Sequence, residues 1–433
     1  MLQDATPKGS AGSPYDLSKH DFKGNATQRN TANSYLISAP GYYKIPLVYG
    51  NAITNGSNNT SSYQTANSGS NILQKFKDHA GKDITSPYIN VQNSSNPATE
   101  AFIVWTDHDG FIIDESSLSV TGSGQNSYVN FHVPANEIKN CNAVIAVNNA
   151  SGTIMWSWHL WFDHKEVLET VKCTNFQGKD YNFTKQTLGF AYRRWDGSTY
   201  DKKRMVKVKF EQTVGQKASG KQHATITIEQ EPGSVKEISS TLYQFGRKDA
   251  LPGTDNIADG SFNKNTEDKL YVTNGIQHPE TFYADLQPLD FSYRYYNLWS
   301  MDNTIDDHND NSVVKTIYDP CPAGFHMPAS NAFTGFTMNG QDHGPMNVSG
   351  AWDYGWNFNN KISSPDATVY FPASGYRDYY DGSLYYVGSE GVYWSAVPYT
   401  NNSSCCLCVY SDNLYPLGYR ERTDVNSVRP VSE

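Results

Sequence analysis

The sequence predicts a mainly β fold in which an immunoglobulin-like β-sandwich region precedes a compact domain that mixes strands with a few short helices. Short apolar or alternating runs follow one another with turn residues between them, which is the pattern of antiparallel sandwiches. No helical periodicity is sustained over residues 31–168. The chain also holds 30 Tyr and 9 Trp among 433 residues, and strands and binding faces favour both. These three observations together indicate the fold class.

Composition and charge exclude several classes of function. The net charge of −10 argues against a nucleic-acid partner, because a phosphate backbone needs clustered Lys and Arg. No apolar run approaches the ~18–20 residues of a transmembrane helix, so no membrane span is expected. The first residues lack the basic and apolar parts of a signal segment, and we expect a trimmed or mature form of an exported chain.

The six cysteines indicate neither a metal site nor a disulfide framework. Cys405 and Cys408 form a CxxC pair, but no second pair and no His at zinc spacing accompanies them. Cys406 is adjacent to Cys405, a spacing that does not support three disulfides. Cys141 precedes an apolar run, so a buried free thiol is expected there. No metal and no cofactor is therefore expected.

The chain is expected to begin with a tail and a sandwich. Residues 1–30 are polar, with Gly, Ser and Pro near the start, so they are expected to form a disordered tail. Residues 31–168 are expected to form the β-sandwich domain, with Asn51–Asn71 as a long polar loop. Strands are expected to include Ala101–Trp105, Tyr128–Val133, Ala143–Val147 and Ile154–Trp161.

A second β-rich segment or immunoglobulin-like domain is expected over residues 169–235. Alternation in Met205–Glu211 and Ala224–Glu229 predicts two strands with one buried and one wet face, as in an antiparallel sheet. The Glu231–Gly233 turn breaks the pattern, so a domain boundary is expected just after it. The remainder, 236–433, has shorter strands, denser aromatic residues and longer loops, which predicts a compact α+β domain.

The end of the chain has the composition of a recognition surface. Between Gly391 and Gly418 there are four Tyr, three Asn, four Ser and three Cys, and Asp412 is the only charge. Stiff, amphipathic Tyr combined with adaptable Ser and Asn is the mixture that antibody binding loops use. A catalytic centre needs titratable groups held close together, which this stretch lacks. The sequence therefore predicts a ligand-binding surface, no catalytic residues and no enzyme activity.

Strand geometry divides the centre of this stretch into two faces. Leu407 and Val409 alternate with Cys406, Cys408 and Tyr410, so the first two are expected in the core and the other three on an exposed face. Among the candidates, tyrosines would anchor a ligand by stacking and two arginines would add polar contacts at the rim. The alternative is an ordinary turn and strand rich in Tyr and Asn. The candidate ligand-binding residues are Tyr399, Asn401, Asn402, Ser403, Ser404, Cys406, Cys408, Tyr410, Asp412, Asn413, Tyr415, Tyr419, Arg420 and Arg422.

Other residue groups could carry chemistry but have simpler structural explanations. The acidic loop Asp302–Asn311 offers oxygen ligands suited to calcium, yet it lacks the Gly and the closing Glu of a calcium loop, so a solvated loop is expected. Trp156 and Trp158 alternate on one predicted strand and are expected in the core. The guanidinium of Arg429 is expected to hold backbone carbonyls.

Four motifs in residues 236–433 resemble those of Bacteroides-type surface proteins whose C-terminal region relates to the major paralogous domain first described in Fibrobacter. They are Thr241–Gly253, Tyr318–Ser330, Val392–Ala396 and Asn426–Glu433. The resemblance implies a C-type-lectin-like fold here, akin to the framework of formylglycine-generating enzymes. Two upstream stretches, Thr31–Ile53 and Asn142–Phe162, resemble the β-sandwich part of fimbrillin-like adhesins. Together the two resemblances cover nearly all of the chain.

What the resemblance implies is a cell-surface adhesin or pilus-tip subunit, exported to the outer membrane or a fimbrium. Its expected partners are an extracellular glycan or protein and other pilin subunits. Related lectin-like domains are diversified by retroelements, which scatter Asn, Tyr, Ser, Asp and Cys among fixed positions, as between Tyr399 and Tyr415. Some relatives carry a Cys where this chain has Pro430, so no disulfide from Cys321 is expected. The alternatives are a structural pilin and an enzyme of the carbohydrate-active or formylglycine-generating type.

Overall fold

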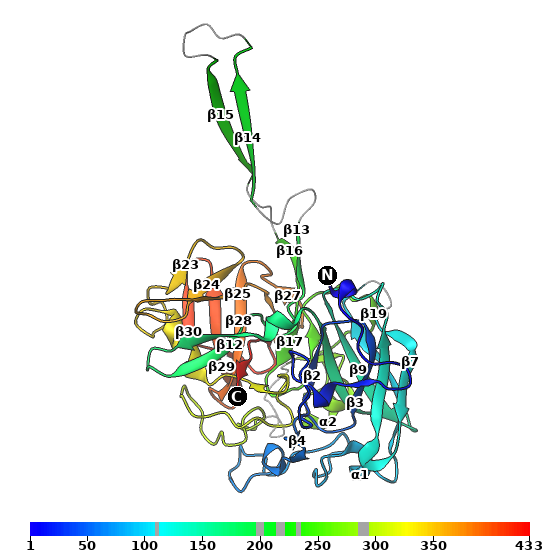
Figure 1. The fold of residues 1–433 in the computed structure, drawn as a ribbon. Helices are drawn as coiled ribbons and strands as arrows, with labels where there is room; N and C mark the ends of the chain where they lie inside the picture. Colours follow the sequence, from blue (N-terminus) through cyan, green and yellow to red (C-terminus); the bar gives the residue numbers. More distant parts are fainter. Residues whose placement is uncertain (109–111, 196–202, 214–220, 231–234, 285–293) are drawn as a thin grey trace.

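The computed structural model is mainly β, with 42% of residues in strands and 8% in helices, which confirms the predicted class (Figure 1). It describes residues 1–108, 112–195, 203–213, 221–230, 235–284 and 294–433. None of the helices in these ranges is long and apolar enough to cross a membrane. They are α1 (Ile89–Gln92), α2 (Val272–Gln277) and the 3-10 helices η1 (Leu2–Asp4), η2 (Leu17–Lys19), η3 (Thr60–Ser62), η4 (Gly124–Asn126), η5 (Lys165–Leu168) and η7 (Ser330–Phe336).

Two sheets make up the N-terminal half and contribute to one hydrophobic core (Figure 1). The first consists, in order, of β1 (Tyr15–Asp16), β3 (Gly41–Pro46), β8 (Tyr128–Val133) and β7 (Asp114–Thr121). The second consists of β19 (Asp259–Gly260), β6 (Ala98–Thr106), β9 (Cys141–Asn149), β10 (Ile154–Phe162) and β2 (Ser34–Ile37). A small separate hairpin joins β4 (Ile53–Thr54) and β5 (Ser57–Asn58). In β8, Val129, Phe131 and Val133 are buried and alternate with partly exposed residues, as strand periodicity requires.

The N-terminal segment belongs to the fold, in contrast to the disordered tail expected for residues 1–30. β1 pairs in parallel with β3, and Lys8 forms a further bridge to Gly41. Leu2 and Leu17 are 4% and 9% exposed and lie in the hydrophobic core. The polar composition of the segment hid these two apolar anchors, whose burial offsets part of the entropy lost on ordering it.

The segment 169–235 is divided between two different structures and does not form the expected immunoglobulin-like domain. One sheet consists, in order, of β11 (Thr170–Thr174), β12 (Asp180–Thr184), β32 (Val431–Ser432) and β22 (Phe325–His326). The first two strands of the segment therefore pair with strands from the end of the chain. Arg429, beside this sheet, donates hydrogen bonds to the carbonyls of Thr184 and Lys185, both at 2.8 Å. This arrangement confirms the role predicted for the Arg429 guanidinium.

The rest of the segment forms a hairpin that projects from the body (Figure 1). Its strands are β13 (Tyr192–Trp195) and β16 (Val235–Ser239) at the base and β14 (Arg204–Glu211) and β15 (His223–Gln230) further out. The apolar face of β14 and β15, which was expected to be buried, is exposed: Val206 and Ile228 are 58% and 57% exposed. Alternation identified the amphipathic strands correctly, but the described residues of this chain do not cover the apolar face.

The C-terminal half is built on an eight-stranded sheet. Its main path is, in order, β18 (Leu251–Pro252), β17 (Thr241–Gln244), β31 (Val425–Val428), β28 (Glu390–Pro398), β29 (Ser403–Tyr410) and β30 (Leu414–Glu421). β26 (Tyr376–Arg377) and β27 (Leu384–Tyr385) join it beside β31. Smaller sheets are formed by β23 (Val348–Ser349), β24 (Gly355–Asn359) and β25 (Thr368–Pro372), and by β20 (Asn263–Asn265) and β21 (Thr281–Tyr283).

The largest hydrophobic core joins the two halves, so the expected domain boundary does not separate two cores. It includes Trp156 and Trp158 of the N-terminal half together with Trp394 of the C-terminal half. Both N-terminal tryptophans are buried, as predicted. The Trp105 indole donates across the junction to the carbonyl of Ala250 at 3.0 Å. β19, which follows the expected boundary, extends the sheet of β6.

Candidate functional site

The strand β29, which holds five of the sequence-predicted ligand contacts, lies between β28 and β30. Leu407 and Val409 pack in one hydrophobic cluster, whereas Cys406 and Cys408 pack in the largest core. The two cysteines are 1% and 3% exposed, so the prediction of an exposed cysteine face was wrong. Alternation separated the two faces, but both faces of this inner strand are covered. Tyr410, at the end of the strand, is partly exposed.

The cysteines do not form a reactive centre. All six are buried and none is in a disulfide. The Sγ atoms of Cys406 and Cys408 are 3.7 Å apart. Burial raises the pKa of the Cys405 and Cys406 thiols, which keeps both protonated at neutral pH. Because a protonated, buried thiol is a poor nucleophile, these residues serve as small core side chains.

Three further predicted contacts are buried. Ser403, Ser404 and Arg422 are 5%, 0% and 0% exposed. The Arg422 guanidinium donates to the carbonyls of Tyr295 and Thr400, both at 2.9 Å, and so fastens neighbouring loops instead of offering a rim contact. The predicted residues that are at least partly exposed are Tyr399, Asn401, Asn402, Tyr410, Asp412, Asn413, Tyr415, Tyr419 and Arg420.

A charged hydrogen-bond cluster lies at the surface end of this sheet. The Arg420 guanidinium donates to Glu390 Oε1 at 2.5 Å and to the Tyr410 hydroxyl at 3.2 Å. The Tyr410 hydroxyl in turn donates to Glu390 Oε1 at 2.7 Å. Burial, reinforced by Cys408 and Glu390, raises the pKa of Tyr410, so its hydroxyl stays protonated and remains a donor. Three polar side chains therefore hold one another in a fixed geometry.

Aromatic side chains extend this cluster into a continuous surface. Tyr385 contacts Tyr386, which stacks on Tyr376 with ring centroids 5.9 Å apart. The Arg420 guanidinium lies 5.4 Å from the Tyr376 ring, and Tyr410 meets Tyr415 edge to face at 5.6 Å. Tyr385 and Tyr386 are 43% and 57% exposed. We call this set the tyrosine ridge: Tyr376, Tyr385, Tyr386, Tyr410, Tyr415 and Arg420.

Sequence reasoning found only half of the tyrosine ridge. It identified Tyr410, Tyr415 and Arg420 in and after the polar stretch near the end of the chain, but it missed Tyr376, Tyr385 and Tyr386. The available signal was the pair of Tyr-Tyr doublets on either side of Asp381–Gly382, a turn dipeptide. Pairing of β26 with β31 brings that hairpin onto the same sheet.

A second aromatic patch joins the loop between β28 and β29, which holds Tyr399, to Tyr419 of β30. Tyr399 and Tyr419 stack almost in parallel, with ring centroids 4.4 Å apart and an interplanar angle of 9°. Tyr419 is 53% exposed, so this pair presents an aromatic surface to solvent. Asn401 Oδ1 accepts a hydrogen bond from Asn71 Nδ2 at 3.0 Å and lies 3.0 Å from the Tyr296 hydroxyl oxygen, contacts that fix the loop.

The acidic loop beside this patch uses its carboxylates within the protein. Asp310 Oδ1 accepts from the Tyr181 hydroxyl at 2.6 Å and from Asn175 Nδ2 at 2.8 Å. Asp306 Oδ2 accepts from the Tyr296 hydroxyl at 2.9 Å. Within the described ranges, no three His, Cys, Asp or Glu side chains gather as a metal site. Most residues from Asp302 to Asn311 are exposed, as expected for a solvated loop, although Asp306 and Asp310 also bind neighbouring side chains.

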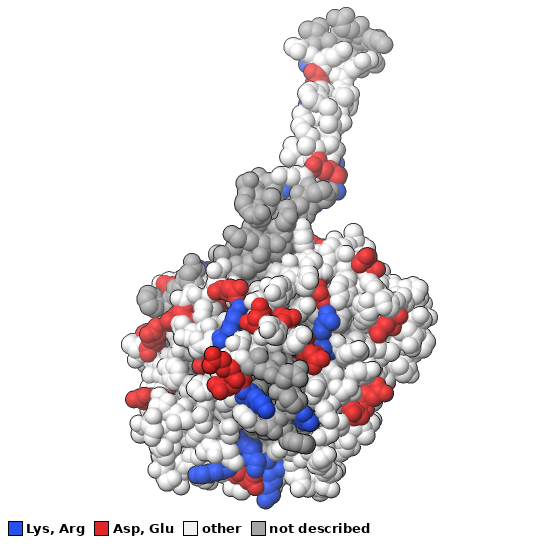
Figure 2. All heavy atoms as spheres, turned by 180° about the vertical axis from the view of Figure 1, so that it is seen from behind, with Lys and Arg blue, Asp and Glu red and all other residues white. Residues whose placement is uncertain are grey.

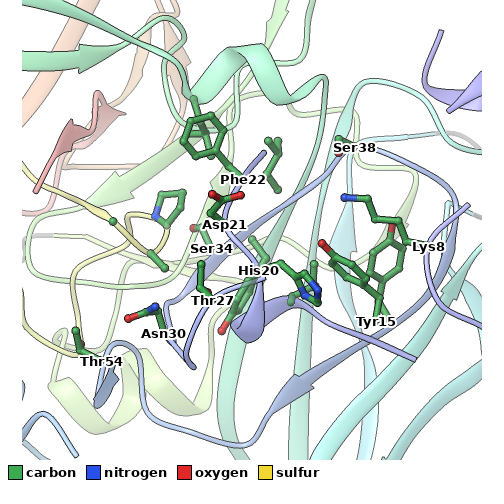
Figure 3. Close-up of a pocket in the computed structure, with 18 of the residues that line it drawn as sticks. Lys8, Tyr15, His20, Asp21, Phe22, Thr27, Asn30, Ser34, Ser38 and Thr54 are labelled. Atoms are coloured by element: carbon green, nitrogen blue, oxygen red, sulfur yellow. The ribbon is translucent and has the colours of Figure 1, made fainter. Parts of the chain in front are cut away.

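A small cavity of ≈ 260 Å³ lies against the N-terminal segment (Figure 3). Tyr15 and His20 stack with ring centroids 3.9 Å apart, and Lys8 Nζ lies 4.8 Å from the Tyr15 centroid. Asp21 and Glu433 also line the cavity. Its volume is below the ~300–1,000 Å³ of typical small-molecule sites. The sequence prediction missed it because residues 1–30 were expected to be disordered.

One known family matches part of the chain. It is described as a domain of unknown function (DUF8237), and the match covers residues 355–431. That span runs from β24 into β32 and contains the whole tyrosine ridge. No curated protein and no solved structure matches the chain.

Proposed function

We propose that this protein is an exported recognition protein, a cell-surface adhesin or pilus-tip subunit, that binds an extracellular glycan or protein without catalysis. The observation that carries the proposal is the tyrosine ridge, in which Arg420 links two groups of partly exposed tyrosines across the C-terminal sheet. The Tyr399–Tyr419 pair offers a second contact area. The resemblance to fimbrillin-like adhesins and lectin-like domains points the same way.

The physical argument rests on rigid tyrosines. A tyrosine side chain offers a large ring and a hydroxyl at low cost in conformational entropy, which suits both sugar stacking and protein contacts. Glu390 holds Tyr410 and Arg420, so this part of the ridge is organised before a ligand arrives. Preorganisation of this kind reduces the entropy lost on binding.

The cysteines and Glu390 give less support to an enzyme than the tyrosine ridge gives to a binding protein. The cysteines that could resemble those of formylglycine-generating enzymes are buried and protonated. Glu390, the carboxylate of the tyrosine-ridge cluster, is 5% exposed and is paired with Arg420. A glycosidase needs two available carboxylates about 5–10 Å apart across a bound sugar.

The buried residues also restrict where a diversified surface would vary. Positions 403–408 lie in cores, so variation there would disturb packing. The positions that are at least partly exposed are 399–402, 410–413, 415, 417 and 419–421, together with Tyr376, Tyr385 and Tyr386. We therefore expect sequence variants of this protein to differ chiefly at those positions.

Binding is tested on glycan and host-protein arrays with the full chain and three variants. Tyr385→Ala with Tyr386→Ala removes the exposed end of the ridge, and Tyr399→Ala with Tyr419→Ala removes the stacked pair. Tyr380→Ala is the control, because Tyr380 is 65% exposed in the same hairpin but outside the ridge.

We expect the ridge variant to bind at least about tenfold more weakly, since anchor residues of this kind carry most of the binding energy. The control is expected to bind as the wild type does, and thermal unfolding checks that every variant folds. Equal binding by the ridge variant, or no ligand on either array, contradicts the proposal and favours a structural pilin.

A further inference from the structure

The projecting hairpin of β14 and β15 has one apolar and one polar face. Its register places Val206 opposite Ile228 and Val208 opposite Ile226, and directly opposed side chains share a face. Phe210 continues this face and is 54% exposed. Figure 2 shows the hairpin standing clear of the body, with mostly uncharged residues on the side in view. A two-stranded ribbon of this kind is marginally stable alone in water, so a covering partner would stabilise it.

Part of the polar face of the hairpin is paired within the hairpin. Lys203 pairs with Glu229 at 2.6 Å, and Lys209 pairs with Glu211 at 3.3 Å. The apolar face has no such internal partner among the described residues, and its exposed Val206, Ile226 and Ile228 are neighbours and not scattered single residues. The apolar face is therefore the face without a packing partner among the described residues.

The net charges of the hairpin and of the rest of the chain indicate which molecule covers the apolar face. Residues 203–230 carry six Lys or Arg and two Glu, which gives them a net charge of +4. Because the whole chain has a net charge of −10, the rest of the chain has a net charge of −14. A basic hairpin thus projects from an acidic body. Oppositely charged surfaces on one molecule attract a second copy of the same molecule.

The N-terminal half offers a groove of matching chemistry. A hollow of ≈ 560 Å³ lies between β6 and β7, lined by apolar Ala101, Phe102, Leu118 and Val120, and by Glu100 as its single charge. A second hollow of ≈ 600 Å³, lined without any charged residue, shares part of this wall. The first hollow also has polar Thr99, Ser119 and Asn148 in its lining, so its wall is mixed, with an apolar strip and no Lys or Arg.

Both walls of the groove are strands with open edges. β7 is the last strand of its sheet and pairs only with β8 among the described strands. β6 pairs with β9 on one side, and on its other side β19 reaches only Trp105 and Thr106. An edge of this kind leaves backbone donors and acceptors available to a strand from another molecule. Glu115, beside Asp259, adds acidic charge at this edge.

We propose that the apolar face of the β14–β15 hairpin docks in the β6–β7 groove of a second copy of this chain. The contact is heterologous: each copy has one hairpin and one groove, so the association is head to tail and can continue into an open chain. This inference does not depend on the tyrosine ridge or on the proposed ligand binding.

The test is sedimentation velocity of the full chain over a wide concentration range. The hairpin variant is Val206→Ser with Ile228→Ser, and its matched control on the polar face is Thr225→Ser with Thr227→Ser. The groove variant is Ala101→Lys with Val120→Lys, at two partly exposed positions. Thermal unfolding verifies that each variant retains the fold of the body.

We expect concentration-dependent association of the wild type and of the polar-face control. The hairpin and groove variants should each raise the dissociation constant at least about tenfold, because each loses or disrupts buried apolar area. A mixture of the two variants should form complexes that stop at two copies, since one intact hairpin and one intact groove remain between them.

Other outcomes overturn the proposal. If the wild type stays monomeric over the whole concentration range, the hairpin does not bind the groove of a second copy. Association that survives in the groove variant places the hairpin elsewhere, for example against another hairpin. If the protein is monomeric and instead co-floats with vesicles of mixed neutral and anionic lipid, the apolar face binds a membrane and not a second copy.

Discussion

The buried thiols are the residue-scale feature with the most direct test. Six cysteines lie in described parts of the chain, all buried and none in a disulfide. We expect the native protein to react with a thiol reagent at least about a hundredfold more slowly than the denatured protein, because access requires opening of the core. Denaturation under non-reducing conditions should then release six reactive thiols. Rapid labelling of Cys406 or Cys408 in the native state, located by mass spectrometry, would contradict their burial.

A buried carboxyl makes stability depend on pH. Asp163 Oδ1 accepts from Asn140 Nδ2 at 2.6 Å and from the His164 amide at 2.7 Å, and burial raises its pKa from 3.8 to about 7. The unfolded state releases this proton near pH 3.8, whereas the folded state retains it to about pH 7. The stability that Asp163 contributes is therefore present below pH 3.8 and is lost as pH rises towards 7.

We expect Asp163→Asn to remove this loss. Its Tm should rise relative to that of the wild type as pH increases from 3.8 to 7, and the difference should then level off. Asp412→Asn, at an exposed position, is the control for removing a surface carboxyl. A constant difference for Asp163→Asn would show that this carboxyl titrates alike in both states.

At the same scale, residue patterns predicted which side chains share a face but not which faces are covered. Leu407 and Val409 were assigned to the core from alternation, and they are there. Cys406 and Cys408 follow the same alternation, yet they are buried because the largest core packs against their side. The covering residues, such as Trp394, come from strands whose pairing the local sequence does not encode.

At the scale of elements, the N-terminal segment allows a test of whether it is structural. We expect Leu2→Ala and Leu17→Ala each to lower the free energy of unfolding by ~2–4 kcal/mol, as for other large-to-small changes in a core. Lys19→Ala, an exposed neighbour, is expected to change it by less than ~0.5 kcal/mol. Chemical denaturation measures all three, and an unchanged midpoint for both leucine variants would show that the segment is detached.

Strand positions were predictable from sequence, but partners were not. Tyr128–Val133 is the observed β8, and the predicted runs at Ala101–Trp105 and Ala143–Val147 lie within β6 and β9. β1 was missed because two residues of strand in a polar segment give no periodicity. Alternation correctly predicted which residues of β14 and β15 share an apolar face. It did not predict that this face is exposed, because exposure depends on where the hairpin lies relative to the rest of the protein.

At the scale of the whole molecule, the shared core predicts cooperative unfolding. The sequence suggested separate domains over residues 31–168 and 236–433, yet one core contains side chains from both. We expect a single calorimetric transition with equal calorimetric and van't Hoff enthalpies. Two resolved transitions would mean that the halves unfold independently.

The lectin-like part of the fold prediction remains an expectation at this scale. The mainly β class followed from composition and strand signals that act locally. The division into domains did not follow, because β19 and Trp105 cross the expected boundary through contacts between residues far apart in sequence. A family resemblance carries information about motifs, such as Asn426–Glu433, but not about how two regions pack together.

The position of β31 and β32 has a consequence for how the polypeptide is made. Residues 425–432 supply strands that lie between β17 and β28 and between β12 and β22, while Leu2 lies in the same large core as Val428. The native sheets cannot close until a ribosome has added residue 432. Contacts of such long sequence separation also form slowly. Throughout synthesis the earlier strands are left with open edges, and a chaperone or a translocation channel that holds the chain extended would protect it from aggregation.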